Sequence, residues 1–170
     1  INSARSAGLL PENLDGRYQQ NITRKEFCDL IATYFRAKTG LSIEYYCSSN
    51  GISVNTAQFS DSSDYYVPYV AALGIVTGYE DGTFQPTREL SRQEAAVILQ
   101  RLYTVLYGNI EVSPTLYADN GSIGVWAKDS VYAMRQTGIM QGVGANRFAP
   151  KNGYTCEQSI ITMLRMTQKA

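Results

Sequence analysis

Hydrophobic residues recur at helical spacing in three stretches of the chain. Within each stretch the apolar side chains stand three or four positions apart, which is the pattern of one buried helix face. They are Phe27, Leu30, Ile31, Tyr34 and Phe35; then Ala95, Ile98, Leu99, Leu102 and Leu106; then Ile160, Ile161 and Leu164. Gly40 and Gly108 follow the first two stretches, and glycine commonly ends a helix. The pattern predicts three amphipathic helices.

A repeat relates the segments that precede the second and third of these helices. Residues 74–86 read GIVTGYEDGTFQP, and residues 138–150 read GIMQGVGANRFAP, an offset of 138 − 74 = 64. Upstream, the aromatic-x-Asp sequences at 59–61 and 117–119 are related by 119 − 61 = 58, so an indel of six residues separates them. A weaker copy, with Gly8-Leu9-Leu10-Pro11 and without the aromatic-x-Asp opening, comes first. We therefore expect three related units, the first beginning inside its repeat.

Each unit is predicted to consist of a short helix, a turn-rich connector and a long helix, giving a mainly α protein. The short helices are expected at 65–73 and 126–137, and isolated β-bridges are compatible with the connectors. The predicted boundaries are 1–40 for repeat 1, 59–108 for repeat 2 and 117–170 for repeat 3, with linkers at 41–58 and 109–116. Because one such unit cannot bury its own apolar stripe, the three are expected to share a centre.

The long helices all open on Ser or Thr followed three residues later by Glu or Gln. The copies are Thr23-Arg24-Lys25-Glu26, Ser91-Arg92-Gln93-Glu94 and Thr155-Cys156-Glu157-Gln158. This is the capping-box pattern, in which the hydroxyl and the Glu or Gln side chain satisfy helix N-terminal N–H groups. Capping alone explains the first and last residue of each tetrad.

Arg24 and Arg92 have no part in a capping box. A cation at the positive end of a helix dipole is mildly unfavourable, whereas a guanidinium beside free backbone N–H groups can grip a carboxylate. We favour an anion site, and pairing with an acid of a neighbouring repeat stays open. An anion site implies that Arg92→Ala loses ligand binding with little change in melting temperature.

Composition excludes several functions. Lys+Arg and Asp+Glu both number 15, and a zero net charge argues against electrostatic binding of nucleic acid. The chain has no histidine, which removes the histidine-based nucleophile pairs and zinc motifs. Cys28, Cys47 and Cys156 lack metal-ligand spacing and select no disulfide. We expect no enzyme, cofactor, metal or membrane insertion, and an export signal would lie outside this fragment.

Together, these motifs resemble the S-layer-homology repeat. The resemblance rests on Phe59-x-Asp61, the Gly-Ile-x-x-Gly connector, Asp81-Gly82-Thr83-Phe84-x-Pro86 and Ser91-Arg92-Gln93-Glu94, where the family has Thr-Arg-Ala-Glu. It covers repeat 2 closely, repeat 3 well and repeat 1 as a truncated copy. It implies a pseudo-threefold assembly in which the long helices make a central bundle.

The resemblance also implies a function and a site. The family anchors larger secreted proteins at the surface of Gram-positive-type cells by binding pyruvylated secondary cell-wall polysaccharide in grooves between repeats. Carried over by position, Asp61, Ser63, Gly78 and Arg92 line one groove with Trp126 as its aromatic wall.

The same comparison leaves the other two grooves less complete. Arg24 serves a second groove, while Cys156 stands where repeat 3 should carry its arginine.

Two alternatives stay open. The departures in repeats 1 and 3 fit a degenerate scaffold or protein–protein module without glycan binding. A carboxylate-dependent glycan hydrolase would need two facing acids, and no spacing among Asp61, Asp64, Asp81 and Glu94 selects such a pair.

Overall fold

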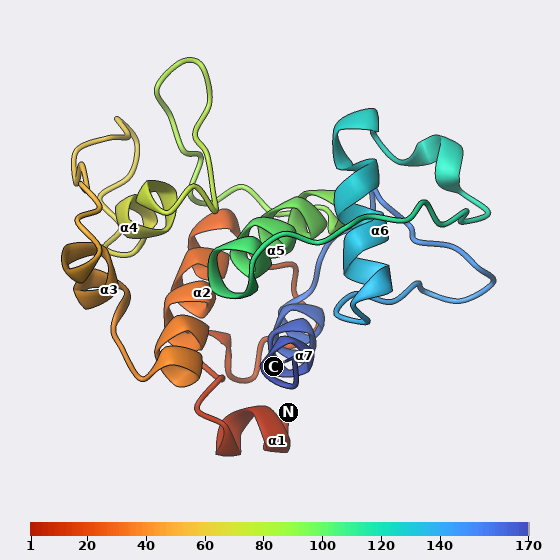
Figure 1. Ribbon diagram of the computed structural model, residues 1–170, viewed down its shortest axis with the longest axis horizontal. Coiled ribbons are helices and arrows are strands. Elements are labelled where there is room, and N and C mark those ends of the chain that lie inside the picture. The colour runs from red at the N-terminus through yellow and green to blue at the C-terminus, as the bar shows by residue number, and fades with distance from the viewer. Residues whose placement is uncertain (170) are drawn as a thin grey trace.

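A computed structural model describes residues 1–169 of this chain, and Ala170, the last residue of the predicted repeat 3, lies outside the described part. The fold is mainly α, as predicted (Figure 1). In chain order its elements are α1 (Asn2–Ser6), η1 (Glu12–Leu14), α2 (Arg24–Thr39), α3 (Ile43–Ser49), α4 (Val67–Ala72), α5 (Arg92–Tyr107), η2 (Asn120–Ser122), η3 (Val125–Ala127), α6 (Lys128–Gln136) and α7 (Cys156–Thr167). Within residues 1–169, no helix combines the length and the hydropathy that crossing a bilayer requires.

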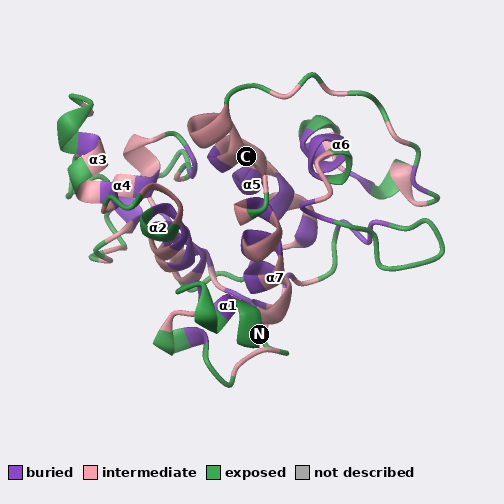
Figure 2. Ribbon diagram, turned by 60° about the horizontal axis from the view of Figure 1, so that its bottom comes forward, coloured by how far each residue is buried: buried purple, intermediate pink, exposed green. Residues whose placement is uncertain are grey.

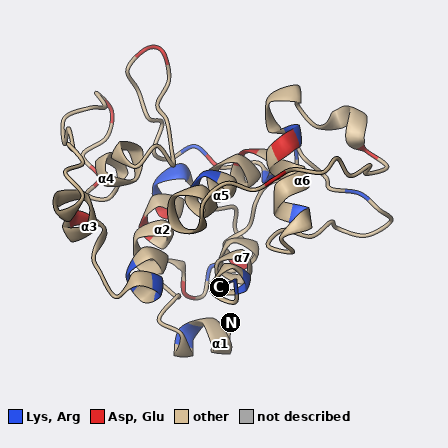
Figure 3. Cartoon of the chain, in the orientation of Figure 1, with Lys and Arg blue, Asp and Glu red and all other residues tan. Residues whose placement is uncertain are grey.

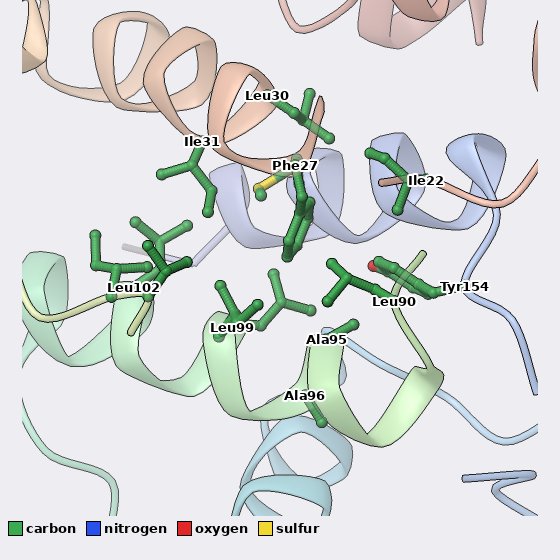
Figure 4. Packing of buried hydrophobic residues seen from close by; sticks show 14 of the residues in the cluster. Ile22, Phe27, Leu30, Ile31, Leu90, Ala95, Ala96, Leu99, Leu102 and Tyr154 are labelled. Atoms are coloured by element: carbon green, nitrogen blue, oxygen red, sulfur yellow. The ribbon is translucent and has the colours of Figure 1, made fainter. Parts of the chain in front are cut away.

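The long helices α2, α5 and α7 enclose the core. Their apolar faces bury Phe27 and Leu30 of α2, Leu99 of α5 and Ile160 of α7, all with no exposed surface. Buried residues lie along all three helices (Figure 2), and Phe27, Leu30 and Leu99 lie together between the helices in Figure 4. Tyr154, just before α7, packs edge-on against Phe27 with ring centroids 5.8 Å apart. The predicted helical stripes are therefore the core-facing surfaces.

A closed ring of backbone hydrogen bonds joins the residues that precede the three long helices. Ile22 N donates to Tyr154 O at 2.8 Å, Tyr154 N donates to Leu90 O at 2.9 Å, and Leu90 N donates to Ile22 O at 3.1 Å. Each unit gives one donor and one acceptor, so the three pack in cyclic order. This ring is the structural basis of the pseudo-threefold arrangement.

The outer helices follow the same cyclic order. The α4 helix packs on α2, η3 and α6 pack on α5, and α1 packs on α7. Each long helix is thus covered by the short helix of the next unit, and the connectors cross in the same direction. Lys25 N donates to Pro86 O at 2.9 Å, and Gln93 N donates to Pro150 O at 3.0 Å.

Two of the three predicted capping boxes are complete. Thr23 with Glu26 and Ser91 with Glu94 make both reciprocal hydrogen bonds. Thr155 accepts from Gln158 N, but the prediction of a third complete box was wrong. The Gln158 side chain accepts instead from the Arg92 guanidinium at 3.1 Å, because Arg92 of the preceding unit reaches this helix end.

The predicted linker 41–58 contains a helix that the sequence analysis missed. Helix α3 begins after Ser42, whose hydroxyl accepts from Tyr45 N, and it buries Ile43 and Cys47 one turn apart. It packs on α2 and α4. The Ser- and Asn-rich composition hid a short amphipathic pattern. The predicted helix 126–137 is in fact a 3₁₀ turn, η3, followed by α6, and the predicted helix 65–73 is the shorter α4.

We expect Ser91→Ala to lower the free energy of unfolding by about 1 kcal/mol, because the helix loses its N-cap acceptor and the partner of Glu94. Denaturant titration would measure it. Ser63 is exposed, so Ser63→Ala is the matched control and should stay within about 0.5 kcal/mol of the parent. Equal effects of the two changes would contradict the capping role.

Candidate functional site

Two grooves lie at junctions between units. The Arg24 groove has a volume of about 220 Å³ and is lined by Arg24, residues 76–79, α5 side chains and Trp126. The Arg92 groove has a volume of about 350 Å³ and is lined by Arg92, residues 140–143, Tyr154 and α7 side chains. Eight lining positions correspond at the 64-residue offset, as in 140 − 76 and 165 − 101. The repeat therefore builds the same groove twice.

Both arginines of the capping tetrads are buried, with 9% of Arg24 and 4% of Arg92 exposed. Arg24 Nε donates to Phe84 O at 2.8 Å and Nη2 donates to Thr77 O at 2.7 Å. Arg92 repeats this arrangement one unit on, donating to Phe148 O at 2.9 Å and to Gln141 O at 2.8 Å. Each guanidinium holds the connector of the next unit by two main-chain carbonyls.

This geometry contradicts the alternative in which each arginine pairs with an acid of a neighbouring repeat, whereas the anion site stays a prediction. Within residues 1–169 neither Arg24 nor Arg92 forms an ion pair. Each lies over a phenylalanine ring, at 4.4 Å from the Phe84 centroid and 4.9 Å from that of Phe148. The carbonyl oxygens accept hydrogen bonds from the guanidinium groups, but they carry no net charge that would cancel the positive charge. Burial lowers the pKa of both groups, yet arginine stays cationic at neutral pH. The positive charge therefore remains at each groove.

The Arg24 groove keeps donors available. In the described part of the chain Arg24 Nη1 has no hydrogen-bond partner, whereas Arg92 Nη1 is taken by Gln158. Arg101, on α5, adds a second guanidinium and makes no ion pair among residues 1–169. The one acid in the lining, Glu94, is paired with Arg88 at 2.7 Å. Basic residues also occur in the first turns of α2 and α5 (Figure 3). The groove is suited to an anion.

Trp126 forms the rim of the Arg24 groove. Trp126 is the one tryptophan of the chain, and it is 61% exposed although its indole is large and apolar. A Cβ built on Gly124 would lie 2.5 Å from Trp126 Nε1, so the ring rests directly on that glycine. Gly124 N in turn donates to Gln93 Oε1 at 2.9 Å, which ties the turn to α5. An exposed aromatic face held beside two arginines can stack on the apolar face of a sugar ring.

The structure brings together three of the six predicted site residues: Arg24, Gly78 and Trp126 line one groove. Arg92 lines the other groove, and so it does not share a site with Gly78 and Trp126. Ser63 is exposed and lines neither. The reason for the regrouping is the cyclic order, since each arginine serves the connector of the unit that follows it.

Asp61 also lies outside both grooves, because it organises its own connector. Its carboxylate accepts from Phe84 N at 2.7 Å and from Gln85 N at 2.9 Å. The bond from Phe84 N is the main reason that the pKa of Asp61 is lowered. Asp119 accepts in the same way from Phe148 N and Ala149 N. The aromatic-x-Asp motif therefore fixes the connector whose carbonyls the arginines hold.

Gly78 lines the Arg24 groove, but packing explains the glycine. A Cβ at this position would lie 2.3 Å from the Phe59 ring and 2.8 Å from Thr83 O. Gly142 is constrained in the same way by Arg147 O at 2.6 Å. The expectation that glycine lets a sugar approach the backbone is therefore unnecessary at Gly78.

Arg101 and its counterpart Arg165 were not predicted from the sequence as site residues. Both lie on the long helices at the 64-residue offset and line corresponding grooves. The signal was present, because an arginine repeated at one position outside the apolar stripe has no packing role. Arg165 makes two long hydrogen bonds of 3.4 Å, to Ile139 O and to Gln141 Oε1.

At the third junction Cys156 takes the place of the arginine and is fully buried. Its N–H donates to Gln20 O at 2.8 Å, so the backbone contact between units persists without a guanidinium. The nearby Arg17 forms an ion pair with the capping residue Glu26. In the described part of the chain, this junction therefore has no counterpart of Arg24 and Arg92.

The capping carboxylates make stability depend on pH. Burial opposes the ionisation of Glu94, but hydrogen bonds from Ser91 and Arg88 outweigh it and lower its pKa; Glu26 is lowered similarly, through Thr23 and Arg17. A lowered pKa stabilises the fold above the ordinary value of 4.5, and that stabilisation is lost as pH falls through the folded-state pKa. We expect urea denaturation to show a smaller loss between pH 7 and pH 3 for the double variant Glu26→Gln, Glu94→Gln. Parallel pH profiles would contradict this.

Two segments, residues 59–96 and 121–153, match the family model of the S-layer homology domain. An amylopullulanase of Thermoanaerobacterium thermosulfurigenes is 29% identical over 92% of this chain and 8% of its own length. The exoglucanase XynX of Acetivibrio thermocellus is 30% identical over 92% of the chain and 14% of its own length. A cellulosome-anchoring protein of the same species is 24% identical over 89% and 33%. The chain thus spans a small part of these relatives, and similarity to two enzymes over 8% and 14% of their lengths carries no catalytic activity with it.

Proposed function

Because this chain belongs to the S-layer homology domain family, we propose that it anchors a larger protein non-covalently to an anionic secondary polysaccharide of the cell wall. Anchoring at the cell surface is the common property of the family match and of the cellulosome-anchoring relative. In this proposal the polysaccharide carries a pyruvylated terminal sugar, and the wall is of the Gram-positive type. The chain acts as a binding module.

The observation that carries the proposal is the Arg24 groove. It combines two guanidinium groups, Arg24 and Arg101, with the exposed indole of Trp126. A pyruvate ketal presents one carboxylate on a sugar ring, so the cations suit the charged substituent and the indole suits the apolar ring face. A neutral sugar would leave the guanidinium charge unused.

The Arg92 groove is a second site with different chemistry. It carries Gln158 where the Arg24 groove has Glu94, and it keeps Arg165 at the position of Arg101. Gln158 occupies Arg92 Nη1, and the rim has no tryptophan. We expect weaker binding here because one donor is taken and the stacking surface is missing.

Sedimentation with purified cell-wall sacculi tests the function. The chain should bind native sacculi and should lose binding when the secondary polysaccharide is removed, or when only its pyruvate groups are hydrolysed. Equal retention on native and stripped sacculi would contradict the proposal and favour the scaffold alternative. The double variant Arg101→Ala, Trp126→Ala locates the binding in the Arg24 groove, because neither side chain belongs to the core.

A further inference from the structure

A pocket of different composition lies on repeat 3, next to the Arg92 groove. Its volume is about 310 Å³, and it is lined by Tyr117, Arg135, Asn146, Arg147 and residues of the connector 141–144. Gln141 and Gly142 line both this cavity and the Arg92 groove, so the two are adjacent. We call it the Tyr117 pocket. It holds two arginines outside the grooves described above.

Tyr117 presents an unmet polar group in this pocket. Its side chain is only 5% exposed, and its hydroxyl has no hydrogen-bond partner within the described residues. Burial raises the pKa of Tyr117 more than the neighbouring Arg135 guanidinium lowers it, so the hydroxyl is protonated and can donate at neutral pH. A buried hydroxyl without a partner is costly, and few native groups remain so. A phenylalanine would pack against Phe148 equally well without that cost.

The two guanidinium groups are only partly compensated. Arg135 Cζ lies 4.5 Å from the centroid of the Tyr117 ring, and Nη1 donates to Asn146 Oδ1 at 3.3 Å. Within residues 1–169 Arg135 forms no ion pair. Arg147 Nε lies 3.8 Å from Asp119 Oδ2, and both Asp119 oxygens already accept backbone N–H groups. One carboxylate therefore faces two cations, leaving a net positive charge.

Repeat 2 shows that the fold does not require these groups. The positions that correspond to Tyr117, Arg135 and Arg147 are 117 − 58, 135 − 64 and 147 − 64, which are occupied by Phe59, Ala71 and Thr83. Phe59 packs on Phe84 as Tyr117 packs on Phe148. The same connector is thus built without the hydroxyl and without either arginine. Of repeats 2 and 3, only repeat 3 carries all three donors.

We propose that the Tyr117 pocket binds an oxyanion, a phosphate or carboxylate group, held by Arg135 and Arg147 with the Tyr117 hydroxyl as a third donor. Arginine pairs suit the planar or tetrahedral oxygens of such groups. The oxyanion comes from a free small anion or from an acidic polymer that crosses the connector. This site is additional to the proposed anchoring groove and shares no residue with it.

NMR titration of the whole chain with inorganic phosphate, and separately with acetate, tests the site through the arginine Nε–Hε and tyrosine ring signals. We expect saturable shifts at Tyr117 and Arg135 with at least one anion. The double variant Arg135→Ala, Arg147→Thr should weaken binding at least tenfold, and Tyr117→Phe about fivefold. These substitutions install the residues of repeat 2, so the fold is expected to tolerate them.

Lys151→Ala is the matched control, because it removes an exposed positive charge from the same repeat outside the pocket lining. It should change affinity less than twofold. Titration with the wall polysaccharide, intact and stripped of its anionic groups, distinguishes the sources: tighter binding of the intact polymer than of phosphate identifies a polymer-borne group. Absence of saturable shifts, or equal affinity of the double variant and the parent, would overturn the site. Neither result affects the NMR signal of the Trp126 indole, which reports on the Arg24 groove.

Discussion

Replacing Arg92 with alanine should destabilise the fold by about 3 to 5 kcal/mol. The guanidinium is 4% exposed and donates to Phe148 O, Gln141 O and Gln158 Oε1. Alanine would leave buried carbonyls without a donor and open a cavity beneath the connector of repeat 3. This expectation reverses the interpretation from sequence, in which Arg92 was free to grip a ligand and could be removed with little change in melting temperature.

Denaturant titration of Arg92→Ala beside Arg165→Ala would test this role. Arg165 lines the same groove and also donates to Gln141, but only through long hydrogen bonds near the surface. Its removal should cost less than about 1 kcal/mol. Arg92→Lys should recover only part of the stability, because an ammonium cannot make the forked contact to separate carbonyls. A parent-like melting curve for Arg92→Ala would restore the view of Arg92 as a dedicated ligand group.

The second large effect concerns binding and not stability. Trp126→Ala should weaken binding of a pyruvylated saccharide about 30-fold, which corresponds to about 2 kcal/mol. The side chain is 61% exposed, so its loss should change the free energy of unfolding by less than about 0.5 kcal/mol. Calorimetric titration of the saccharide into each variant gives the affinities, and thermal unfolding gives the stability.

Two neighbours of Trp126 provide controls for that prediction. Val125 lies in the same 3₁₀ turn, is 85% exposed and does not line the groove, so Val125→Ala should bind like the parent. Gly124→Ala keeps the indole but places a methyl group where Nε1 now lies, at 2.5 Å. It should therefore displace the ring and weaken binding. Equal affinities for the parent and Trp126→Ala would show that the ligand does not stack there.

Periodicity and repetition were sufficient to predict the architecture. The apolar stripes gave the three long helices, the capping tetrads gave their first residues, and Gly40 and Gly108 marked two of their ends, each with positive φ. These features are local, because helix faces and caps depend on residues within one or two turns. Helix α3 was missed because only Ile43 and Cys47 carry its buried face in an otherwise polar segment.

The composition of the site could not be predicted in the same way, because it depends on the cyclic packing of the units. Along the sequence, Arg92 and Gly78 belong to the same repeat. In the structure, Arg92 binds the connector of the next unit, and Gly78 lines the same groove as Arg24. The carbonyl partners were also invisible, since a main-chain oxygen has no sequence signature. Trp126, from the following unit, lines the same groove as Gly78, and its role as the aromatic wall of a sugar site stays a prediction.

The arrangement links stability to recognition through the arginines. Arg24 holds Thr77 O and Phe84 O, and Thr77 and Gly78 form the wall of the groove that Arg24 also lines. The wall is thus fixed before any ligand arrives, which reduces the entropy lost on binding. In the proposed site, the half-buried Arg101 then supplies a charge and the exposed Trp126 a stacking face. We therefore expect variation at these two positions to change ligand preference without unfolding the protein.

Fluorescence of Trp126 gives the most direct test of ligand binding in the Arg24 groove, because Trp126 is the one tryptophan of the chain and forms the rim of that groove. The chain is titrated with a pyruvylated monosaccharide and, in parallel, with the same sugar lacking the pyruvate. A saturable change in emission with the first sugar, weak or absent with the second and lost in Arg101→Ala, is the predicted result. An unchanged emission spectrum with both sugars, while the chain still sediments with native sacculi, would contradict binding at this groove.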